Sequence, residues 1–480
     1  VERSRGLGDV YKRQQVYDRE VEFRVLEDAY KSNKAEMVII YGRRRMGKTT
    51  LVQEFLNKVG GVYLFTPRAN IDMILEMFSK DLSEQLGEFI RFRDWKDFLE
   101  FLVFKSKKER FVIAIDEFQR ISKADEPAIS MLQHYWDNYL SKTKIVLILI
   151  GSLVGMVEKL ALTGDAPLCG RKTRELKLSQ IPYIVLRDYW KNYDEEQRVE
   201  IYGFFGGTPA YFSLTSDEMS PIENVAKLVL EPGAKLAREP EELLSEELRA
   251  PHTYMSILGQ IARLKVGAPL SKIKVRKGSP MSYLYTLMKM DIIEPLESLA
   301  QGSKIYTIKD DFFRFWFKFI YPRQTLLELK RGLLLVDKIE KSKDEFLAFT
   351  FEKILREFIV FASGFEIKGV EIPCIHKIGA FWKKDVEIDA CALANDTVIC
   401  GEAKWEKRKV DRTEVEKLIA KMNFAKKELR VKESIGIILS RSGFTNSARA
   451  LEGKNLILLD LEDFAAEAKK IKKHISSLHL

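Results

Sequence analysis

Residues 37–52, MVIIYGRRRMGKTTLV, constrain the fold of this chain more than any other stretch. An apolar run typical of a buried strand leads into a glycine-containing turn, and Lys-Thr-Thr opens the next predicted helix. The turn fits G-x-x-x-x-G-K-[ST], in which backbone N–H groups wrap a phosphate chain and the helix N-terminus favours an anion. The stretch therefore predicts a nucleotide-binding P-loop, although a glycine-bearing turn before any helix remains the structural alternative.

Each residue type in this pattern has a chemical reason. The glycines let the backbone approach phosphate, a lysine reaches the β and γ phosphates, and a hydroxyl ligates Mg²⁺. We expect ATP and Mg²⁺ as cofactors, with the phosphate-binding set Gly42, Gly47, Lys48, Thr49 and Thr50.

A second apolar run, residues 110–117, ends in two acids. This pattern predicts a buried parallel strand that delivers carboxylates at its C-terminal edge. Asp116 would then hold the Mg²⁺ shell, and Glu117 would orient or deprotonate the attacking water. A simple strand-end turn is the alternative, and the distance from the P-loop favours the first interpretation.

A third strand, predicted over residues 144–152, ends at Ser152. A small polar residue there suits a sensor of the γ-phosphate, and a helix N-cap suits it equally. Strands alternating with helices, with these residues at strand ends, predict a doubly wound parallel sheet.

Length and composition exclude several classes of protein. A chain of 480 residues is expected to form two to four domains. The longest apolar run, residues 145–157, is interrupted by glycine and serine and is too short to span a membrane, so no membrane partner is expected. Four cysteines without C-x-x-C pairs fit a cytoplasmic protein without a structural metal, and the net charge of +9 is weak support for a polyanionic partner.

Residues 1–14 lack an apolar segment typical of a signal peptide and are interpreted as a non-native leader.

Residues 252–322 predict a winged helix. Helices are expected over residues 254–264, 270–275 and 281–290, followed by a hairpin that turns at Gln301 and Gly302. The basic residues around the third helix suit phosphate contacts with DNA, and a solvated charged face is the alternative: Arg263, Lys265, Lys272, Lys274, Arg276 and Lys277. The aromatic run at residues 312–321 is expected to be interdomain core rather than a base-stacking surface.

A second chemical site is predicted near the C-terminus. Alternation in the strand of residues 397–405 places Glu402 and Lys404 on one face, and an antiparallel strand brings Asp389 beside them. Glu352 could add a carboxylate from the preceding helix, whereas Glu387 is expected to face solvent. Carboxylates can share Mg²⁺ while a lysine orients water, which is the chemistry of phosphodiester cleavage.

Six segments occur in an order that resembles the archaeal-type ATPases of the STAND/AAA+ branch: VYDRE at 16–20, YGRRRMGKTTL, AIDEFQ, LIGSLVGMVE, PLCGR at 167–171 and YGFFGGTPAY at 202–211. The resemblance covers residues 16–321 and extends into the C-terminal domain. It implies that Gly207 and Pro209 form a lid motif on the nucleotide base, and that Arg171 acts on the γ-phosphate of a neighbouring subunit. Cys169 replaces the family tyrosine, which leaves the placement of Arg171 open. Without the family, a turn and a surface salt bridge explain these residues.

The C-terminal pattern, IGAFWKKDVEIDAC followed by GEAKW, resembles the PD-(D/E)xK nuclease-like domain partnered with these ATPases. The resemblance matches Asp389, Glu402 and Lys404 to the nuclease motif, with Glu352 at the helical position and Asp389 and Glu402 as metal ligands. We expect an ATPase core over residues 16–160, a lid over 161–240, a winged helix over 241–322, a connector over 323–344 and the nuclease-like domain over 345–480. The predicted function is an ATP-hydrolysing DNA-binding protein, possible as a homo-oligomer, with a Mg²⁺-dependent DNA nuclease. The alternative is an ATP-controlled switch whose nuclease-like domain is inactive.

Overall fold

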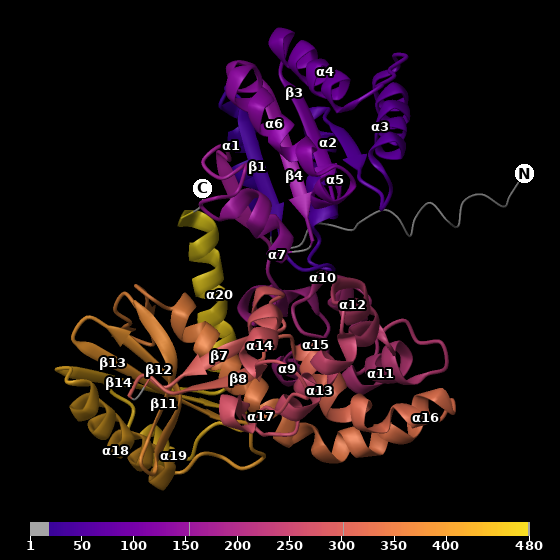
Figure 1. Ribbon diagram of the computed structural model, residues 1–480. Helices are drawn as coiled ribbons and strands as arrows, with labels where there is room; N and C mark the ends of the chain where they lie inside the picture. Colours follow the sequence, from indigo (N-terminus) through magenta and orange to yellow (C-terminus); the bar gives the residue numbers. More distant parts are fainter. Residues whose placement is uncertain (1–18, 153, 301, 479–480) are drawn as a thin grey trace, which may run out of the picture. The chain divides into compact units, whose positions relative to one another are not determined.

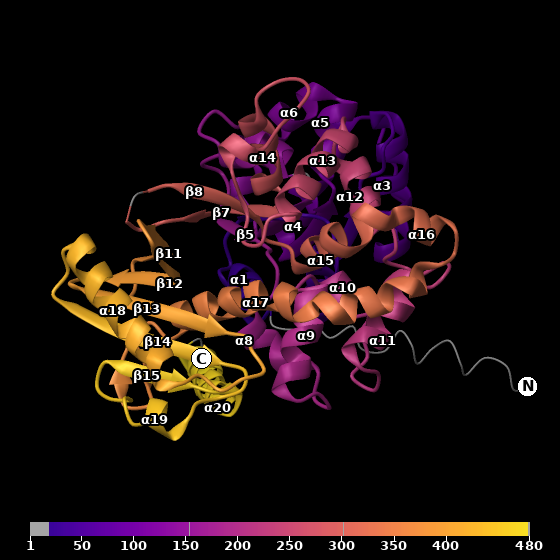
Figure 2. The same cartoon turned by 90° about the horizontal axis from the view of Figure 1, so that it is seen from below.

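The computed structural model describes residues 19–152, 154–300 and 302–478, so the leader, the VYD part of the first family segment and the turn residue Gln301 lie outside the described residues. The chain divides into two compact units, Val1–Ser179 and Gln180–Leu480. Figures 1 and 2 show both units from two directions.

The first unit contains a five-stranded parallel sheet in the order β2-β3-β4-β1-β5. Its strands are β1 (Glu36–Tyr41), β2 (Val62–Phe65), β3 (Phe111–Asp116), β4 (Ile145–Gly151) and β5 (Arg174–Lys177). The helices and turns are α1 (Glu20–Lys31), α2 (Lys48–Val59), α3 (Ile71–Leu86), α4 (Trp95–Lys108), α5 (Gln119–Ala124), α6 (Glu126–Asn138), η1 (Leu140–Lys142), α7 (Val154–Val157) and η2 (Glu158–Leu162).

Alternation along β1 explains why this sheet is buried on both faces. Val38 and Ile40 join a core with α1 and α2, whereas Met37 and Ile39 join a second core with α3, α4 and α6. The parallel α/β fold expected from the P-loop is therefore confirmed. The sheet extends past residue 160, where the sequence analysis ended the core, because β5 pairs with β1.

The second unit begins with small helices and turns: α8 (Tyr183–Leu186), η3 (Arg187–Tyr189), α9 (Glu195–Phe205), α10 (Pro209–Phe212), α11 (Pro221–Val225), η4 (Ala226–Leu230) and α12 (Glu239–Glu247). It continues with α13 (Pro251–Ala262), β6 (Ala268–Pro269), η5 (Leu270–Lys272), α14 (Pro280–Lys289), β7 (Ile293–Glu297), β8 (Lys304–Ile308), α15 (Asp311–Phe315), η6 (Trp316–Ile320), η7 (Tyr321–Arg323), α16 (Gln324–Glu328) and η8 (Gly332–Leu335).

The region expected to be a winged helix has two of the three predicted helices. α13 and α14 form, and β7 and β8 pair as the predicted antiparallel hairpin. The predicted middle helix is only the 3-10 turn η5, because β6 pairs with β8 immediately before it and holds that stretch extended. In α14, Leu284 and Leu287 are buried, whereas Tyr285 is 54% exposed.

The aromatic run of α15 and η6 is core, as predicted. Phe312, Phe315 and Trp316 are fully buried, and their neighbours include rings of α9, α10 and α17. A base-stacking role for this run is excluded by that burial.

The C-terminal part contains α17 (Val336–Phe361), β9 (Glu366–Ile367), β10 (Val370–Glu371), β11 (Lys377–Lys383), β12 (Val386–Ala394), β13 (Thr397–Lys404), α18 (Arg412–Leu429), β14 (Glu433–Ser440), α19 (Asn446–Arg449), β15 (Leu456–Leu459) and α20 (Leu461–Leu478). The sheet order is β11-β12-β13-β14-β15, antiparallel up to β13 and parallel from there. The connector expected over residues 323–344 is largely helical, since α17 already begins at Val336.

The β7–β8 hairpin lies against the edge strand β11 (Figure 2). Ser298, just after β7, forms a bridge with Ala380, and its hydroxyl exchanges hydrogen bonds with the backbone of Trp382 at 3.0 and 3.1 Å. This contact covers the exposed edge of the C-terminal sheet.

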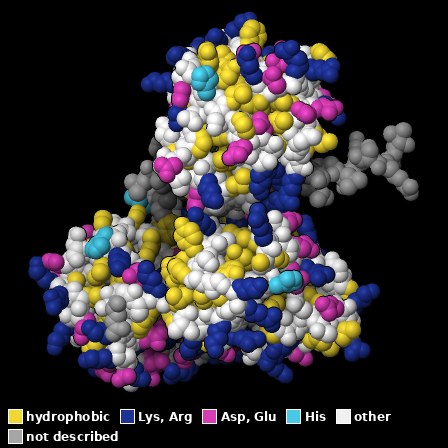
Figure 3. All heavy atoms as spheres, viewed as in Figure 1, with side chains coloured by type: hydrophobic (Ala, Val, Ile, Leu, Met, Phe, Trp, Pro, Cys, Tyr) yellow, Lys and Arg dark blue, Asp and Glu magenta, His cyan; other side chains and the backbone are white. Residues whose placement is uncertain are grey.

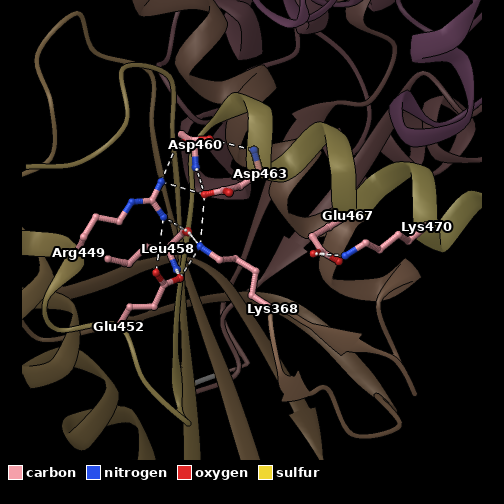
Figure 4. A network of polar contacts seen from close by, with 8 residues as sticks. All are labelled: Lys368, Arg449, Glu452, Leu458, Asp460, Asp463, Glu467 and Lys470. Atoms are coloured by element: carbon pink, nitrogen blue, oxygen red, sulfur yellow. Dashed lines mark hydrogen bonds and ion pairs between the residues drawn. The ribbon is translucent and has the colours of Figure 1, made fainter. Parts of the chain in front are cut away.

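A polar network ties the start of α20 to the neighbouring strands (Figure 4). Arg449 donates to Asp463 at 2.8 Å and to the Leu458 carbonyl at 2.7 Å, and it also pairs with Asp460. Lys368, in the β9–β10 turn, forms an ion pair with Glu452 at 2.7 Å.

Among the described residues, no helix is both long and apolar enough to cross a membrane.

Candidate functional site

The phosphate loop lies between β1 and α2, where glycine is required at two positions. Gly42 has φ 149°, and a Cβ there would lie 2.3 Å from the Leu178 carbonyl oxygen. Gly47 has φ 78° and precedes α2, which starts without a side-chain cap. Lys48 lies across the loop and donates to the carbonyls of Gly42 at 2.7 Å and Arg43 at 2.9 Å. The first turn of α2 therefore presents N–H groups and a lysine to an anion.

Asp116, at the end of β3, accepts three hydrogen bonds. The Thr49 hydroxyl donates to Oδ2 at 2.7 Å, the Tyr63 hydroxyl donates to the same oxygen at 2.8 Å, and the Glu117 N–H donates to Oδ1 at 2.8 Å. The structure thus brings the P-loop hydroxyl and the predicted strand-end acid together.

Glu117 is a buried carboxylate held by its surroundings. Its backbone has φ 55°, the left-handed region that a non-glycine residue rarely adopts. Ser152 donates to Oε1 at 2.5 Å, Gln119 donates to Oε2 at 2.7 Å, and Arg120 forms an ion pair at 3.3 Å. Ser152 therefore contacts Glu117, the predicted catalytic acid. Neither of the two roles predicted for Ser152, a γ-phosphate sensor or a helix N-cap, specified this contact.

The residues of this site fit a magnesium nucleotide. Mg²⁺ prefers hard oxygen ligands and commonly binds through a few protein oxygens together with phosphate oxygens. A hydroxyl and a carboxylate that meet beside a lysine and uncapped helix N–H groups supply that donor set.

The three residues implied by the family resemblance, Arg171, Gly207 and Pro209, have structural roles within their own units. Arg171 forms a bidentate pair with Asp137, at 2.8 and 2.7 Å, and donates to the Pro167 carbonyl. In the second unit, a Cβ at Gly207 would lie 1.8 Å from the Ile181 carbonyl oxygen, and Pro209 opens α10. This close backbone approach requires glycine at 207. The packing of Gly207 and Pro209 on a nucleotide stays a prediction.

The second acidic site lies where β12 and β13 separate. Their pairing ends at Ala390 and Gly401, and the Asp389 carboxylate accepts the next N–H, that of Ala403, at 2.9 Å. Burial, followed by the charges of Glu402 and Glu352, raises the pKa of Asp389 to about 7.

Glu402 and Lys404 share one face of β13, as alternation predicted. A Cβ at Gly401 would meet Leu355 and Ile359 of α17, so Glu402 points to the opposite face, toward α18. There the Glu402 carboxylate accepts from Lys404 at 3.0 Å and from Lys421 at 2.6 Å. Burial opposes the charge of Lys404, yet the Glu402 carboxylate raises the pKa of that lysine.

Glu352 approaches from α17, on the other side of the sheet from Glu402. Its nearest ion pair is Arg356 at 3.8 Å, and Arg356 also donates to the Asp389 carbonyl at 2.7 Å. Burial raises the pKa of Glu352. Glu387 is exposed, as expected. Glu352 thus influences Asp389 through its charge from the far side of the sheet.

The described residues contain no group of three or more His, Cys, Asp or Glu side chains that could hold a metal ion. A cation at the second site would therefore have Asp389 and Glu402 as its protein carboxylates and phosphate or water as its remaining ligands, which Mg²⁺ accepts. The two lysines on Glu402 oppose this, since they already compensate its charge.

Several contacting residues were not predicted from sequence: Tyr63, Gln119, Arg120, Arg356 and Lys421. Gln119 and Arg120 come shortly after the predicted acids in the sequence, so helical proximity could have suggested them. Tyr63 and Lys421 come from β2 and α18, and sheet order and helix placement are required to find them.

The part of the chain that contains the phosphate loop is similar to known ATPase domains. Residues 16–214 match a family model described as an ATPase domain predominantly from Archaea, and residues 316–418 match one described as archaeal and bacterial proteins of unknown function. An uncharacterized protein of Methanocaldococcus jannaschii is 30% identical over 461 residues, which cover 93% of this chain and 99% of that protein. The chain belongs to this archaeal-type ATPase family.

Two further similarities are more limited. An uncharacterized ATP-binding protein of the same organism is 49% identical over 39 residues, 8% of this ATPase and 66% of that protein. Among solved structures, the Walker-type ATPase PABY2304 of Pyrococcus abyssi is 18% identical, with a TM-score of 0.46, over 64% of this ATPase and 97% of that chain.

Proposed function

We propose that this ATPase binds DNA and cleaves phosphodiester bonds with a C-terminal nuclease domain of PD-(D/E)xK type, and that Mg²⁺ serves both sites. The observation that carries the nuclease proposal is the meeting of Asp389, Glu402 and Lys404 where β12 and β13 separate. The membership in the STAND/AAA+ branch is part of the same proposal and rests on the six ordered segments.

At the first site, the helix N-terminus and Lys48 would hold the phosphates, while Thr49 and Asp116 would hold the cation, which offsets negative charge on the phosphates. Glu117 would accept a proton from the attacking water. Ser152, Gln119 and Arg120 fix the carboxylate for this role. In a homo-oligomer, Arg171 would have to leave Asp137 before it could act on a neighbouring subunit.

At the second site, Asp389 and Glu402 would bind Mg²⁺, whose chemistry there is to polarise the phosphodiester. Lys404, beside Glu402 and 27% exposed in its side chain, would orient the attacking water or stabilise charge on the phosphate. Glu352 acts through its charge on Asp389 in this scheme.

The DNA-binding proposal rests on the surface around α14, which we interpret as the recognition helix of a winged helix. No acidic residue occurs in α14 or in residues 270–279 before it, and Lys272, Lys274, Arg276 and Lys277 are exposed. Figure 3 shows apolar side chains at the surface near α14 and dark blue Lys and Arg side chains distributed over the same unit. Such a surface suits backbone phosphates, with Tyr285 exposed on the helix itself.

One observation favours the alternative of an ATP-controlled switch with an inactive nuclease-like domain. Glu402 already accepts from both Lys404 and Lys421, so its charge is compensated without a metal ion. A domain that uses this arrangement only for stability would keep the same ion pairs.

A plasmid-cleavage experiment distinguishes an active nuclease domain from an ATP-controlled switch with an inactive one. Purified parent protein is incubated with supercoiled plasmid, ATP and Mg²⁺, beside Lys404→Ala and a matched control, Lys407→Ala, whose side chain is 80% exposed. We expect nicking by the parent and the control, a loss of roughly 100-fold in Lys404→Ala, and none in EDTA. ATP hydrolysis is measured on the same preparations and should be equal in all three.

Equal nicking by the parent and Lys404→Ala would assign the cleavage to a contaminant and remove the nuclease proposal. Absence of nicking by every protein with Mg²⁺ and with Mn²⁺, while ATP hydrolysis persists, would instead support the switch.

A further inference from the structure

Tyr63 lies on β2, an edge strand of four residues beside β3. Phe65 pairs with Asp116 in this parallel register, and Tyr63 is two residues earlier on the same face of the sheet. The Tyr63 side chain can therefore extend along that face toward the end of β3, where its hydroxyl donates to Asp116 at 2.8 Å.

The backbone and the ring of Tyr63 are both fixed. Gln85 of α3 accepts from the Tyr63 N–H at 3.0 Å and donates to its carbonyl at 2.8 Å, so a side chain occupies the open edge of the strand. The ring packs against the core formed with α2, the helix that carries Thr49. The hydroxyl is therefore presented to Asp116 by a rigid support.

The hydroxyls of Tyr63 and Thr49 converge on the same oxygen of Asp116, at 2.8 and 2.7 Å. Thr49 has a proposed role as a metal ligand, which would direct its oxygen lone pairs to the cation. Tyr63 has no such role, and its phenol serves only as a hydrogen-bond donor to the carboxylate. A carboxylate held by a permanent donor keeps its orientation whether or not the metal is bound.

We propose that Tyr63 is a positioning residue for magnesium: its hydroxyl orients the Asp116 carboxylate toward the cation of the magnesium nucleotide. The inference rests on the proposed Mg²⁺–ATP site. Hydrogen-bond partners behind a metal ligand typically change metal affinity or activity by about 10- to 100-fold when they are removed, so the effect at Tyr63 should be measurable.

The test measures binding of a fluorescent ATP analogue while MgCl₂ is titrated, with Tyr63→Phe compared with the parent. We expect the Mg²⁺ concentration required for half-maximal tight binding to rise about tenfold, while analogue binding in EDTA and the thermal midpoint of unfolding stay unchanged. Tyr135→Phe is the matched control, because it removes another tyrosine hydroxyl that donates to a carboxylate, Glu100 at 3.4 Å.

Asp116→Asn separates failure of this inference from failure of the site. If Asp116→Asn raises the Mg²⁺ requirement and Tyr63→Phe does not, the role of Tyr63 is overturned and the site stands. If Tyr63→Phe weakens binding equally in EDTA, its role is structural and the inference is again wrong. If neither the parent nor Asp116→Asn responds to Mg²⁺, the proposed magnesium site itself fails.

Discussion

The aspartates of the two candidate sites, Asp116 and Asp389, have opposite electrostatic surroundings. Asp116 accepts from two hydroxyls and one backbone N–H, so neutral donors surround its charge. Asp389 accepts from one backbone N–H and lies within the fields of two other carboxylates, which with burial raise its pKa to about 7. Donors that point at a carboxylate favour its charged form, whereas neighbouring acids oppose it. The first site therefore surrounds its carboxylate with neutral donors, whereas the carboxylates of the second site repel one another unless a cation or a lysine compensates their charge.

The largest expected effect concerns the lysine of each site. Lys48→Ala should lower ATP hydrolysis by roughly 100-fold or more, because it removes the cation that meets the phosphates, while Lys404→Ala should leave hydrolysis unchanged. Phosphate release measures both. Lys58→Ala, at the exposed end of the same helix as Lys48, is the control. Hydrolysis by Lys48→Ala at the rate of the parent would show the P-loop assignment to be wrong.

Replacing each aspartate by asparagine tests the comparison directly. Asp389→Asn should increase the free energy of unfolding without divalent metal, because it removes a repelled charge. Asp116→Asn should decrease the free energy of unfolding. The asparagine NH₂ group would replace a carboxylate oxygen that accepts hydrogen bonds, and it would face donors instead of accepting from them. Each change should be on the order of 1–3 kcal/mol by denaturant unfolding. If the free energy of unfolding changed with the same sign in both variants, the proposed electrostatic difference between the two sites would be wrong.

Glu357 is a buried acid outside both sites, and it tests separately how burial raises the pKa of a carboxylate. Burial raises the pKa of Glu357, on α17, to about 7, although it accepts from the Tyr183 N–H at 3.0 Å. Since the folded pKa lies above the ordinary value of 4.5, the folded state binds this proton more tightly. The resulting stability is fully present below pH 4.5 and is lost as the pH rises to 7.

Glu357→Gln should therefore gain on the order of 2 kcal/mol relative to the parent above pH 7 and show a smaller loss of stability between pH 4.5 and 7. Urea unfolding at several pH values measures this. Glu345→Gln, an exposed position on the same helix, should follow the parent at every pH. An unchanged pH dependence in Glu357→Gln would assign the slope to other groups.

The smallest expected effect concerns the surface around α14. Arg276→Ala should weaken DNA binding a few-fold and make its salt dependence shallower by about one counterion, because one phosphate contact is lost. Fluorescence anisotropy over a salt series measures both quantities. Arg249→Ala, an exposed arginine before α13, is the comparison. A DNA affinity of the parent that did not fall with rising salt would contradict phosphate-led binding.

Sequence alone predicted most elements around both sites. The strands predicted over residues 110–117, 144–152 and 397–405 correspond to β3, β4 and β13. Periodicity determines such elements because each buries one face or stripe of its own. The short middle helix of the predicted winged helix failed because strand pairing of β6, a tertiary contact, overrode local propensity.

The acids and lysines at the strand ends were likewise determined by the sequence, since buried strands that end in polar residues must deliver them to a sheet edge. Only the tertiary structure decided what meets them: Tyr63 and Thr49 at Asp116, Ser152 at Glu117, and Lys421 from α18 at Glu402. The physical reason is that a side chain's chemistry is local, whereas its partners depend on sheet order and helix placement, which bring together residues up to 67 positions apart at Asp116.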